Sequence, residues 1–165
     1  MNCYTVSFFG HRIIKNFPDA EKSLEKIIHS LLREKEYVVF LVGRDGDFDQ
    51  IVSSTVRHYK RTIRDDNCSL VWVMPYLTAD YKHNETFYKD YYDEIEVYEN
   101  KSYRHFKAAF QARNKHMVER SDLVVFYIDH NNGGAYQTMR YTQKKNISYI
   151  NIYVEGTMNC GSSIL

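Results

Sequence analysis

Short runs of mostly apolar residues recur along the chain, and they constrain its fold more than any other feature of the sequence. They lie at residues 3–9, 37–42, 69–74, 122–128 and 147–153. A strand that is apolar at nearly every position is buried on both faces, which is typical of a parallel sheet covered by helices. Helical spacing of apolar residues occurs between the runs, for example at residues 18–36, 106–119 and 134–145. The chain is therefore predicted to be an α/β three-layer sandwich, with a mainly parallel sheet of about five strands and helices on both faces.

The order of these elements predicts one Rossmann-like domain over residues 1–154. Residues 77–102 are polar, rich in tyrosine and long for a connection. We interpret them as an insertion that serves as a lid, a cover or an interface. Residues 155–165 contain glycine and serine and are expected to form a flexible tail.

The turns that follow the strands are the candidate ligand site. Right-handed crossovers place these turns along one edge of a parallel sheet, and open sheets bind ligands there. The turns lie at residues 10–12, 43–49, 75–76 and 129–138. Glycines before a helix, as in residues 129–134, suit a phosphate held by main-chain N–H groups, although an ordinary turn has the same composition. His11 could contact a sugar or phosphate, or only cap its strand, and Arg12 could bind an anion.

Composition excludes several classes of function. The 22 basic and 21 acidic side chains give a net charge of +1, which provides no field to attract nucleic acid or an anionic membrane. We therefore do not expect a nucleic-acid or membrane partner. The three cysteines, Cys3, Cys68 and Cys160, are far apart and indicate reduced thiols in a bacterial cytoplasm. Because the acidic turn at residues 45–49 lacks a calcium-loop glutamate and the histidines lack paired spacing, we expect no metal and no cofactor.

A set of motifs along the chain resembles the SLOG superfamily, and most closely its small bacterial YpsA-like branch, once a domain of unknown function. The motifs are residues 8–12, 43 with 46–49, 74–76, 113–118 with 121–122, and 133–136 with 140–141. They span about residues 4–152. The resemblance implies a Rossmann-like fold that binds nucleotides or nucleotide-derived ligands. Relatives include the LOG phosphoribohydrolases and the DNA-processing protein DprA.

The resemblance to the phosphoribohydrolases is incomplete where their chemistry is concerned. Arg113 and Met117 match their arginine-to-methionine helix motif, and Gly133 and Gly134 match the start of their glycine-rich loop. Arg140 stands at the position of their catalytic glutamate, and an arginine cannot accept a proton or balance an oxocarbenium ion. Asp49 or Glu119 could substitute, and Arg140 would otherwise suit an additional phosphate.

We therefore expect a sensor-type protein that binds a nucleotide-like ligand without clear catalytic residues. The alternatives are a phosphoribohydrolase or N-glycosidase acting on a nucleoside monophosphate, and a single-stranded DNA-binding module like DprA. The sequence leaves self-association open. The expected ligand-binding residues are Gly10, His11, Arg12, Gly43, Gly46, Asp49, Pro75, Tyr76, Arg113, Asn114, Gly133, Gly134, Tyr136 and Arg140.

Overall fold

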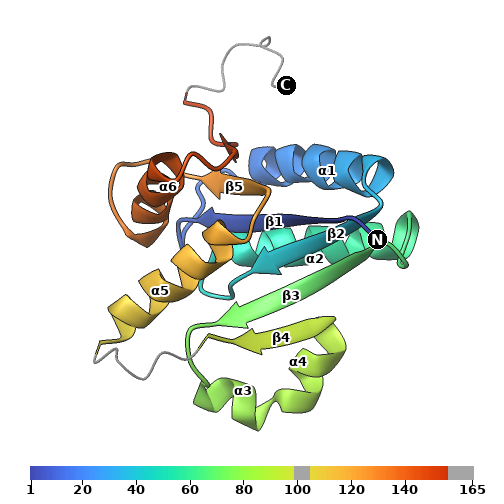
Figure 1. Cartoon of the computed structure of the whole chain (residues 1–165), viewed down its shortest axis with the longest axis horizontal. Coiled ribbons are helices and arrows are strands. Elements are labelled where there is room, and N and C mark those ends of the chain that lie inside the picture. Colours follow the sequence, from blue (N-terminus) through green and yellow to red (C-terminus); the bar gives the residue numbers. More distant parts are fainter. Residues whose placement is uncertain (99–104, 156–165) are drawn as a thin grey trace.

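The computed structural model describes residues 1–98 and 105–155, and they form an α/β sandwich around one parallel sheet. Within these residues the sheet has six strands in the order β4-β3-β2-β1-β5-β6, with every neighbouring pair parallel (Figure 1). The strands are β1 (Cys3–Gly10), β2 (Tyr37–Val42), β3 (Cys68–Met74), β4 (Glu94–Val97), β5 (Leu123–Tyr127) and β6 (Tyr149–Asn151). The predicted fold class is confirmed, and the sheet gains one strand, β4, over the predicted five.

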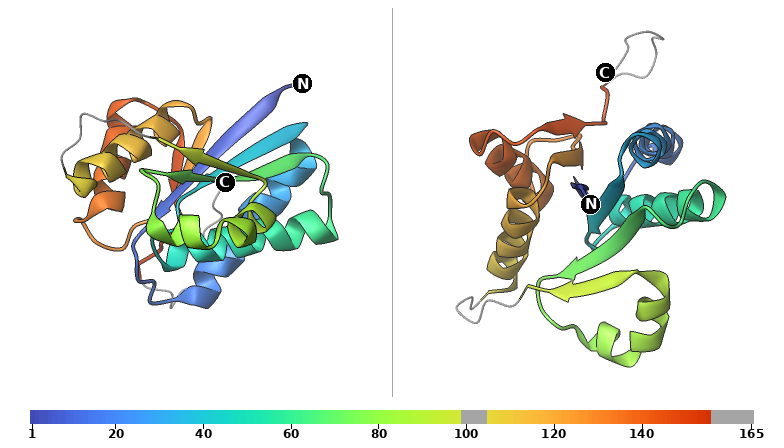
Figure 2. Two further views of the ribbon diagram at one scale, coloured as in Figure 1. Left: turned by 90° about the horizontal axis from the view of Figure 1, so that it is seen from below. Right: turned by 45° about the vertical axis from the view of Figure 1, so that its right-hand side comes forward.

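Helices cover both faces of the sheet, as Figure 2 shows. They are α1 (Phe17–Glu34), α2 (Asp47–Thr62), α3 (Ala79–His83), α4 (Glu85–Tyr91), α5 (Phe106–Glu119) and α6 (Gly134–Lys144). Helices α1 to α4 lie on one face, and α5 and α6 lie on the other. Helix α1 begins at a capping residue, Asn16, whose side chain accepts a hydrogen bond from the Asp19 amide.

The central strands are mostly apolar because successive side chains enter two different cores. In β1, Phe8 packs toward α1 and α2, whereas Phe9 packs toward α5 and α6. The same alternation occurs in β5, where Val125 and Phe126 enter opposite cores. This burial on both faces is the physical reason for the runs seen in the sequence.

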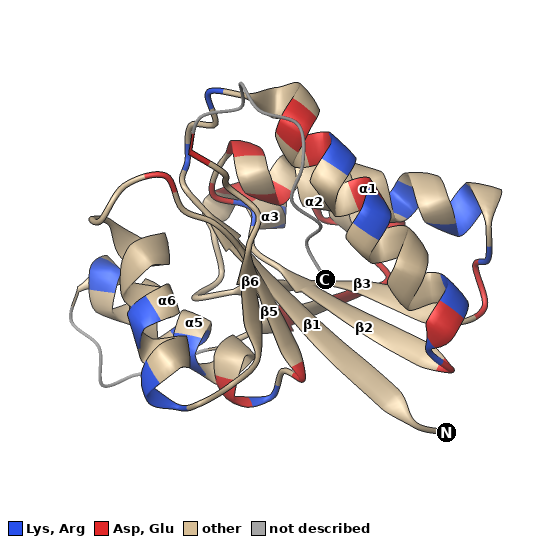
Figure 3. Ribbon diagram, turned by 90° about the horizontal axis from the view of Figure 1, so that it is seen from above, with Lys and Arg blue, Asp and Glu red and all other residues tan. Residues whose placement is uncertain are grey.

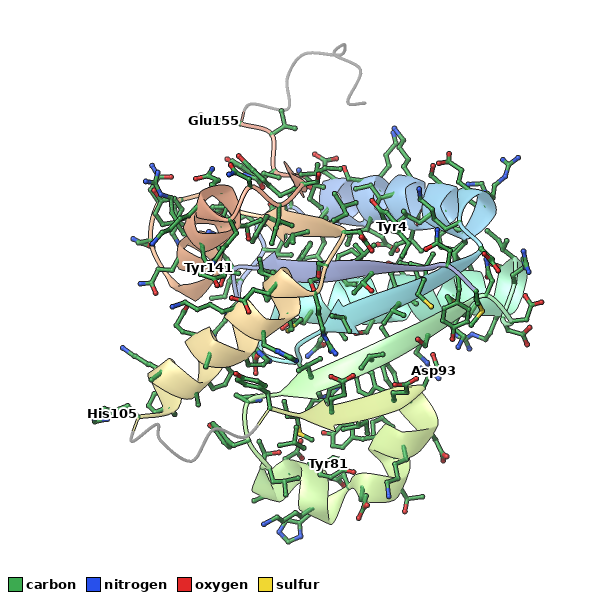
Figure 4. All side chains as sticks on the ribbon, viewed as in Figure 1. Tyr4, Tyr81, Asp93, His105, Tyr141 and Glu155 are labelled. Atoms are coloured by element: carbon green, nitrogen blue, oxygen red, sulfur yellow. The ribbon has the colours of Figure 1, made fainter. Side chains whose placement is uncertain are left out.

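The tyrosine-rich segment predicted as an insertion contains α3, α4 and β4 in its described part, and residues 99–104 lie outside the described residues. The ring of Trp72 packs against Tyr81, Tyr88 and Tyr92, at centroid distances of 6.0, 4.9 and 5.3 Å. Tyr81, a residue of α3, is labelled in Figure 4. These tyrosines therefore attach the segment to β3. Of the predicted tail, residues 156–165 lie outside the described residues.

The strand order reverses between β1 and β5, which pair directly at the centre of the sheet. The chain leaves β1 toward α1 on one face and leaves β5 toward α6 on the other. Loops diverge at such a point and leave a crevice outside the carboxyl ends of the strands. No helix in the described part of the chain is long and apolar enough to cross a membrane.

Candidate functional site

A cleft of about 420 Å³ lies at this crevice, between the turns after β1, β2 and β5 and the first turns of α5 and α6. Its walls combine three kinds of side chain: basic and acidic groups, amides, and three phenylalanine rings. The lining residues are Phe9, Gly10, Arg12, Asp45, Asp49, Phe106, Lys107, Phe110, Gln111, Arg113, Asn114, Gly133, Gly134 and Gln137. Seven of the predicted residues thus meet in one cleft: Gly10, Arg12, Asp49, Arg113, Asn114, Gly133 and Gly134.

Arg113 forms the inner wall of the cleft and is only 4% exposed. Its guanidinium donates to the Val73 carbonyl at 2.9 Å, to Asp45 Oδ2 at 3.0 Å and to Asn114 Oδ1 at 3.0 Å. A side chain at position 43 would press on this network, because a Cβ atom there would lie 3.0 Å from Arg113 Nη1. Two of the five N–H groups of Arg113 therefore join α5 to β3 and to the turn after β2, and a third donates within α5.

Asn114 extends this network to the start of α6. Its side-chain amide donates to Thr138 Oγ1 at 3.1 Å, and the Thr138 hydroxyl donates to the Gly134 carbonyl at 2.9 Å. Both side chains are buried. The network fixes the first turn of α6 relative to α5.

The start of α6 presents main-chain N–H groups to the cleft. Gly133 precedes the helix with a φ of 89°, a conformation that side chains other than glycine rarely adopt. In the described part of the chain, no side chain caps this end of the helix. The first-turn N–H groups have no intrahelical partner and carry positive potential, so they can donate hydrogen bonds to a bound anion.

Arg12 reaches the cleft from the turn after β1, and close packing holds its backbone in place. A Cβ atom at Gly46 would lie 2.5 Å from Arg12 Cα, and the Asp47 amide donates to the Arg12 carbonyl at 2.8 Å. The side chain itself is exposed, and within residues 1–98 and 105–155 no carboxylate pairs with it. Arg12 therefore offers the cleft a cation that no carboxylate of the described residues neutralises.

Asp49 is the carboxyl group of the cleft with an altered pKa. Loss of hydration and the nearby Asp45 charge raise the pKa of Asp49 to about 7, against the opposing effects of the Asp45 amide and Arg113. The Asp45 amide donates to Asp49 Oδ2 at 2.8 Å. A carboxyl group with this pKa exchanges protons near neutral pH.

Sequence reasoning missed the aromatic wall of the cleft. Phe106 and Phe110 lie one turn apart on α5, and Phe106 is 60% exposed. Lys107, Gln111 and Gln137 were also missed. Phenylalanines at i and i+4 that directly precede Arg113 were the available signal, because that spacing places both rings on the helix face that carries the arginine.

Other predicted residues lie outside the lining of the cleft. Pro75 is buried after β3, and Tyr76 makes an edge contact with Phe110 at 6.0 Å. Tyr136 packs against the core under α5 and α6. Gly43 and Gly46 support Arg113 and Arg12 through the contacts described above.

Arg140 lies in a second hollow of about 720 Å³ between α5 and α6. This α5–α6 groove is lined by Gln111, Lys115, Gln137, Arg140, Tyr141, Gln143 and Lys144. It shares Gln111 and Gln137 with the cleft, so the two hollows adjoin. Figure 3 shows basic residues gathered on α5 and α6, and none of the groove-lining residues is acidic. Glu119 at the edge of α5 accepts a hydrogen bond from Tyr141, which is labelled in Figure 4.

His11 lies beside the cleft in a cluster with Asp129 and His130. The His11 and His130 rings stack with centroids 3.6 Å apart, and His11 Nε2 lies 3.4 Å from Asp129 Oδ1. His11 is 8% exposed, and burial together with His130 lowers its pKa, although Asp129 opposes the shift. The ring also faces Gly133, where a Cβ atom would lie 4.0 Å from His11 Nδ1.

No protein-family model matches the chain, and no curated protein matches it. Solved structures do share its fold. DNA processing protein A from Helicobacter pylori, studied for its single-stranded DNA binding mode, matches with a TM-score of 0.63 and 16% identity over 88% of this chain. DprA from Streptococcus pneumoniae matches with a TM-score of 0.64 and 18% identity, also over 88% of this chain. The chain spans 63% and 49% of these two DprA chains.

A third structure, that of the protein TM1055, matches with a TM-score of 0.57 and 13% identity over 88% of this chain and 72% of its own. At these identities the likeness shows the fold, which is the Rossmann-like fold that the SLOG resemblance implied. The YpsA-like branch stays a prediction.

The expectation that nucleic acid is not a partner was wrong. It was drawn from the net charge of the chain. The Helicobacter pylori protein of the same fold binds single-stranded DNA. A net charge of +1 is a sum over the whole surface, and it does not reveal the basic residues gathered on α5 and α6.

Proposed function

We propose that the chain binds a nucleotide-derived ligand in the cleft, with a phosphate between Arg12 and the start of α6. The observation that carries the proposal is that one cleft contains an arginine and a helix N-terminus, neither with a side-chain partner among the described residues, and two phenylalanine rings of α5. Each element supplies a different part of nucleotide recognition. The carboxyl edge of a parallel sheet, at its switch point, is also where ligands bind in this kind of fold.

The charges of the cleft favour a phosphate. Arg113 is neutralised by Asp45 at 3.0 Å, so it contributes shape and hydrogen bonds more than free charge. Arg12 and Lys107 remain as cations of the lining, and Asp49 is partly protonated near neutral pH. A dianionic phosphate would then accept hydrogen bonds from the main-chain N–H groups of Gly134 and the following residues.

The aromatic wall favours a base. Phe106 and Phe110 project from α5 into the cleft, and Phe106 is too exposed to serve the core. Stacking of a base on an aromatic ring contributes about 1–3 kcal/mol to nucleic-acid binding.

Calorimetric titration with nucleoside monophosphates, NAD and ADP-ribose tests the proposal. Arg12→Ala should weaken binding about tenfold or more, because it removes a charge-assisted contact, whereas Arg33→Ala on the exposed surface of α1 should leave affinity unchanged. Phe106→Ala should weaken the binding of nucleotides but not that of ribose 5-phosphate, which has no base. Saturable binding whose affinity is the same in the wild type and in both cleft variants would refute the assignment. Mass spectrometry of each mixture separates a binding protein from a glycosidase, since only the latter releases free base.

A second candidate, binding of single-stranded nucleic acid, is favoured by the α5–α6 groove. Lys115, Arg140 and Lys144 line it without an acidic neighbour in the lining, and it adjoins the cleft at Gln111 and Gln137. A strand whose first nucleotide occupied the cleft could place its next phosphates there. The structural likeness to the DNA-binding Helicobacter pylori protein supports this candidate.

Fluorescence anisotropy with a labelled oligothymidylate, compared with thymidine monophosphate, distinguishes the two candidates. The double charge reversal Lys115→Glu with Arg140→Glu should weaken oligonucleotide binding. It should also reduce the dependence of the logarithm of affinity on the logarithm of salt concentration by about 0.7 per lost phosphate contact. The monophosphate should bind as before. Reversal of Lys22 and Lys26 on α1, on the opposite face, is the matched control. Equal affinity for both ligands in every variant would exclude single-stranded nucleic acid as the ligand and leave the nucleotide as the candidate.

A further inference from the structure

We infer that His11, Asp129 and His130 form a binding site for a divalent transition-metal ion such as Zn²⁺ or Co²⁺. One ligand atom from each residue can be chosen so that all three lie within 4.8 Å of one another. His11 follows β1, and Asp129 and His130 follow β5, so the pairing of these two strands brings the donors together. The site adjoins the cleft but does not depend on a nucleotide being bound there.

The strongest observation is the unused nitrogen of His11. Nε2 is buried and has no hydrogen-bond partner among the described residues, although Asp129 Oδ1 lies 3.4 Å away. A buried polar atom without a partner is costly, and in native proteins such atoms usually have an explanation. A metal ion beside Asp129 would provide the missing partner.

The spacing of the donors supports this assignment. Bonds of about 2.0–2.1 Å to a tetrahedral zinc ion place two ligand atoms roughly 3.4 Å apart, which is the separation of His11 Nε2 and Asp129 Oδ1. The Asp129 side chain is only 10% exposed, and among the described residues the basic side chains within 4.0 Å of it are these two histidines.

His130 completes the set by a small movement. Its Nδ1 lies 2.5 Å from Asp129 Oδ1, which is a hydrogen-bonding distance, so an ion must replace that proton. Imidazole lone pairs lie in the ring plane, and the two rings are stacked at 10°. One ring must therefore turn to share an ion, and His130 can do so because its side chain is 49% exposed.

The donor types select the metal. Imidazole suits zinc, cobalt, nickel and copper, whereas magnesium and calcium prefer oxygen ligands. Three protein donors leave a fourth tetrahedral position open to water. The sequence did not reveal this site, because His11 and His130 are far apart in the chain and do not form a histidine pair on one helix.

Titration of the untagged, chelator-treated chain with Co²⁺ and Zn²⁺ tests the inference. We expect one ion per chain with low-micromolar affinity or better and visible d–d absorption from Co²⁺. His130→Ala and Asp129→Asn should each weaken binding about 10–100-fold, as even the loss of an outer-shell partner can. His83→Ala, an exposed histidine of α3, is the matched control and should bind as the wild type does.

Three results would overturn the inference. They are no binding at millimolar metal, undiminished affinity in both ligand variants, and a thiolate-to-cobalt charge-transfer band, which would assign the ion to a cysteine such as exposed Cys3. Because metal alone is the probe, failure here leaves the nucleotide proposal untouched, and the converse also holds.

Discussion

Arg113 Nη2 lies 3.0 Å from Asp45 Oδ2, and this ion pair ties helix α5 to the turn that follows β2. The two partners differ in their exposure to solvent: the Arg113 side chain is 5% exposed and that of Asp45 is 32% exposed. A charge with so little access to water depends on its partner, whereas the more exposed carboxylate can be hydrated. The consequences of removing either side therefore differ.

Asp45→Ala should lower the free energy of unfolding by about 2–4 kcal/mol, because it leaves the buried guanidinium without its counter-charge. Urea denaturation measures this loss. Asp66→Ala breaks the exposed pair between Arg64 and Asp66 and should cost less than about 1 kcal/mol. Similar small losses in both variants would show that the Arg113 pair is effectively hydrated.

Gly46→Ala should displace the turn that carries Arg12, since the new Cβ atom would lie 2.5 Å from Arg12 Cα. We expect a loss of stability of about 1–3 kcal/mol, together with weaker nucleotide binding. For stability, Gly134→Ala is the comparison, because its Cβ atom would meet only the end of the Gln111 side chain, at 3.3 Å. A Gly46→Ala protein with wild-type stability and affinity would contradict the role given to this contact.

The pKa of Asp49, raised to about 7, predicts a pH-dependent stability. The folded state holds this proton more tightly than the unfolded chain, whose aspartate pKa is about 3.9. The contribution of Asp49 is therefore fully present below about pH 4 and is lost as the pH rises through about 7. Relative to Asp49→Asn, the wild type should lose about 1–3 kcal/mol between pH 4 and pH 8. Denaturation of both proteins across this range checks the prediction, and parallel curves would refute it.

Tyr88→Leu should destabilise the protein without changing nucleotide affinity. Tyr88 is 4% exposed and packs on Trp72 at a centroid distance of 4.9 Å. Loss of this aromatic pair should cost about 1–3 kcal/mol and alter the fluorescence of the chain's single tryptophan. A selective loss of affinity would instead show that the tyrosine-rich segment contacts the ligand.

The fold was predictable where burial on two faces left a clear mark in the sequence. The residues of β2, all apolar, were predicted with the bounds the structure has, as was α5 at Phe106–Glu119. Strand β4 was missed because its residues, Glu94 to Val97, alternate charged and apolar side chains, as suits an edge strand that is partly exposed. The short helices α3 and α4 offered too few turns for a helical period to appear.

The candidate site was predictable by loop but not by side-chain direction. Adjacency of the loops follows from parallel topology, and Arg12 and Gly133 accordingly line one cleft. The direction of a helical side chain depends on rotation about the helix axis. Gln137 therefore lines both hollows, whereas Arg140, almost one turn further along α6, lines only the groove. The cluster of His11 with His130 depends on side-chain rotamers, which the sequence does not specify.

Gln111 and Gln137 form a wall common to the cleft and the α5–α6 groove. A ligand long enough to cross that wall would be bound at two points, and release of one end would leave the other end bound. The loosened end would return from a high effective concentration. Such a ligand would dissociate slowly even if each contact were weak, and a short competitor would displace it stepwise.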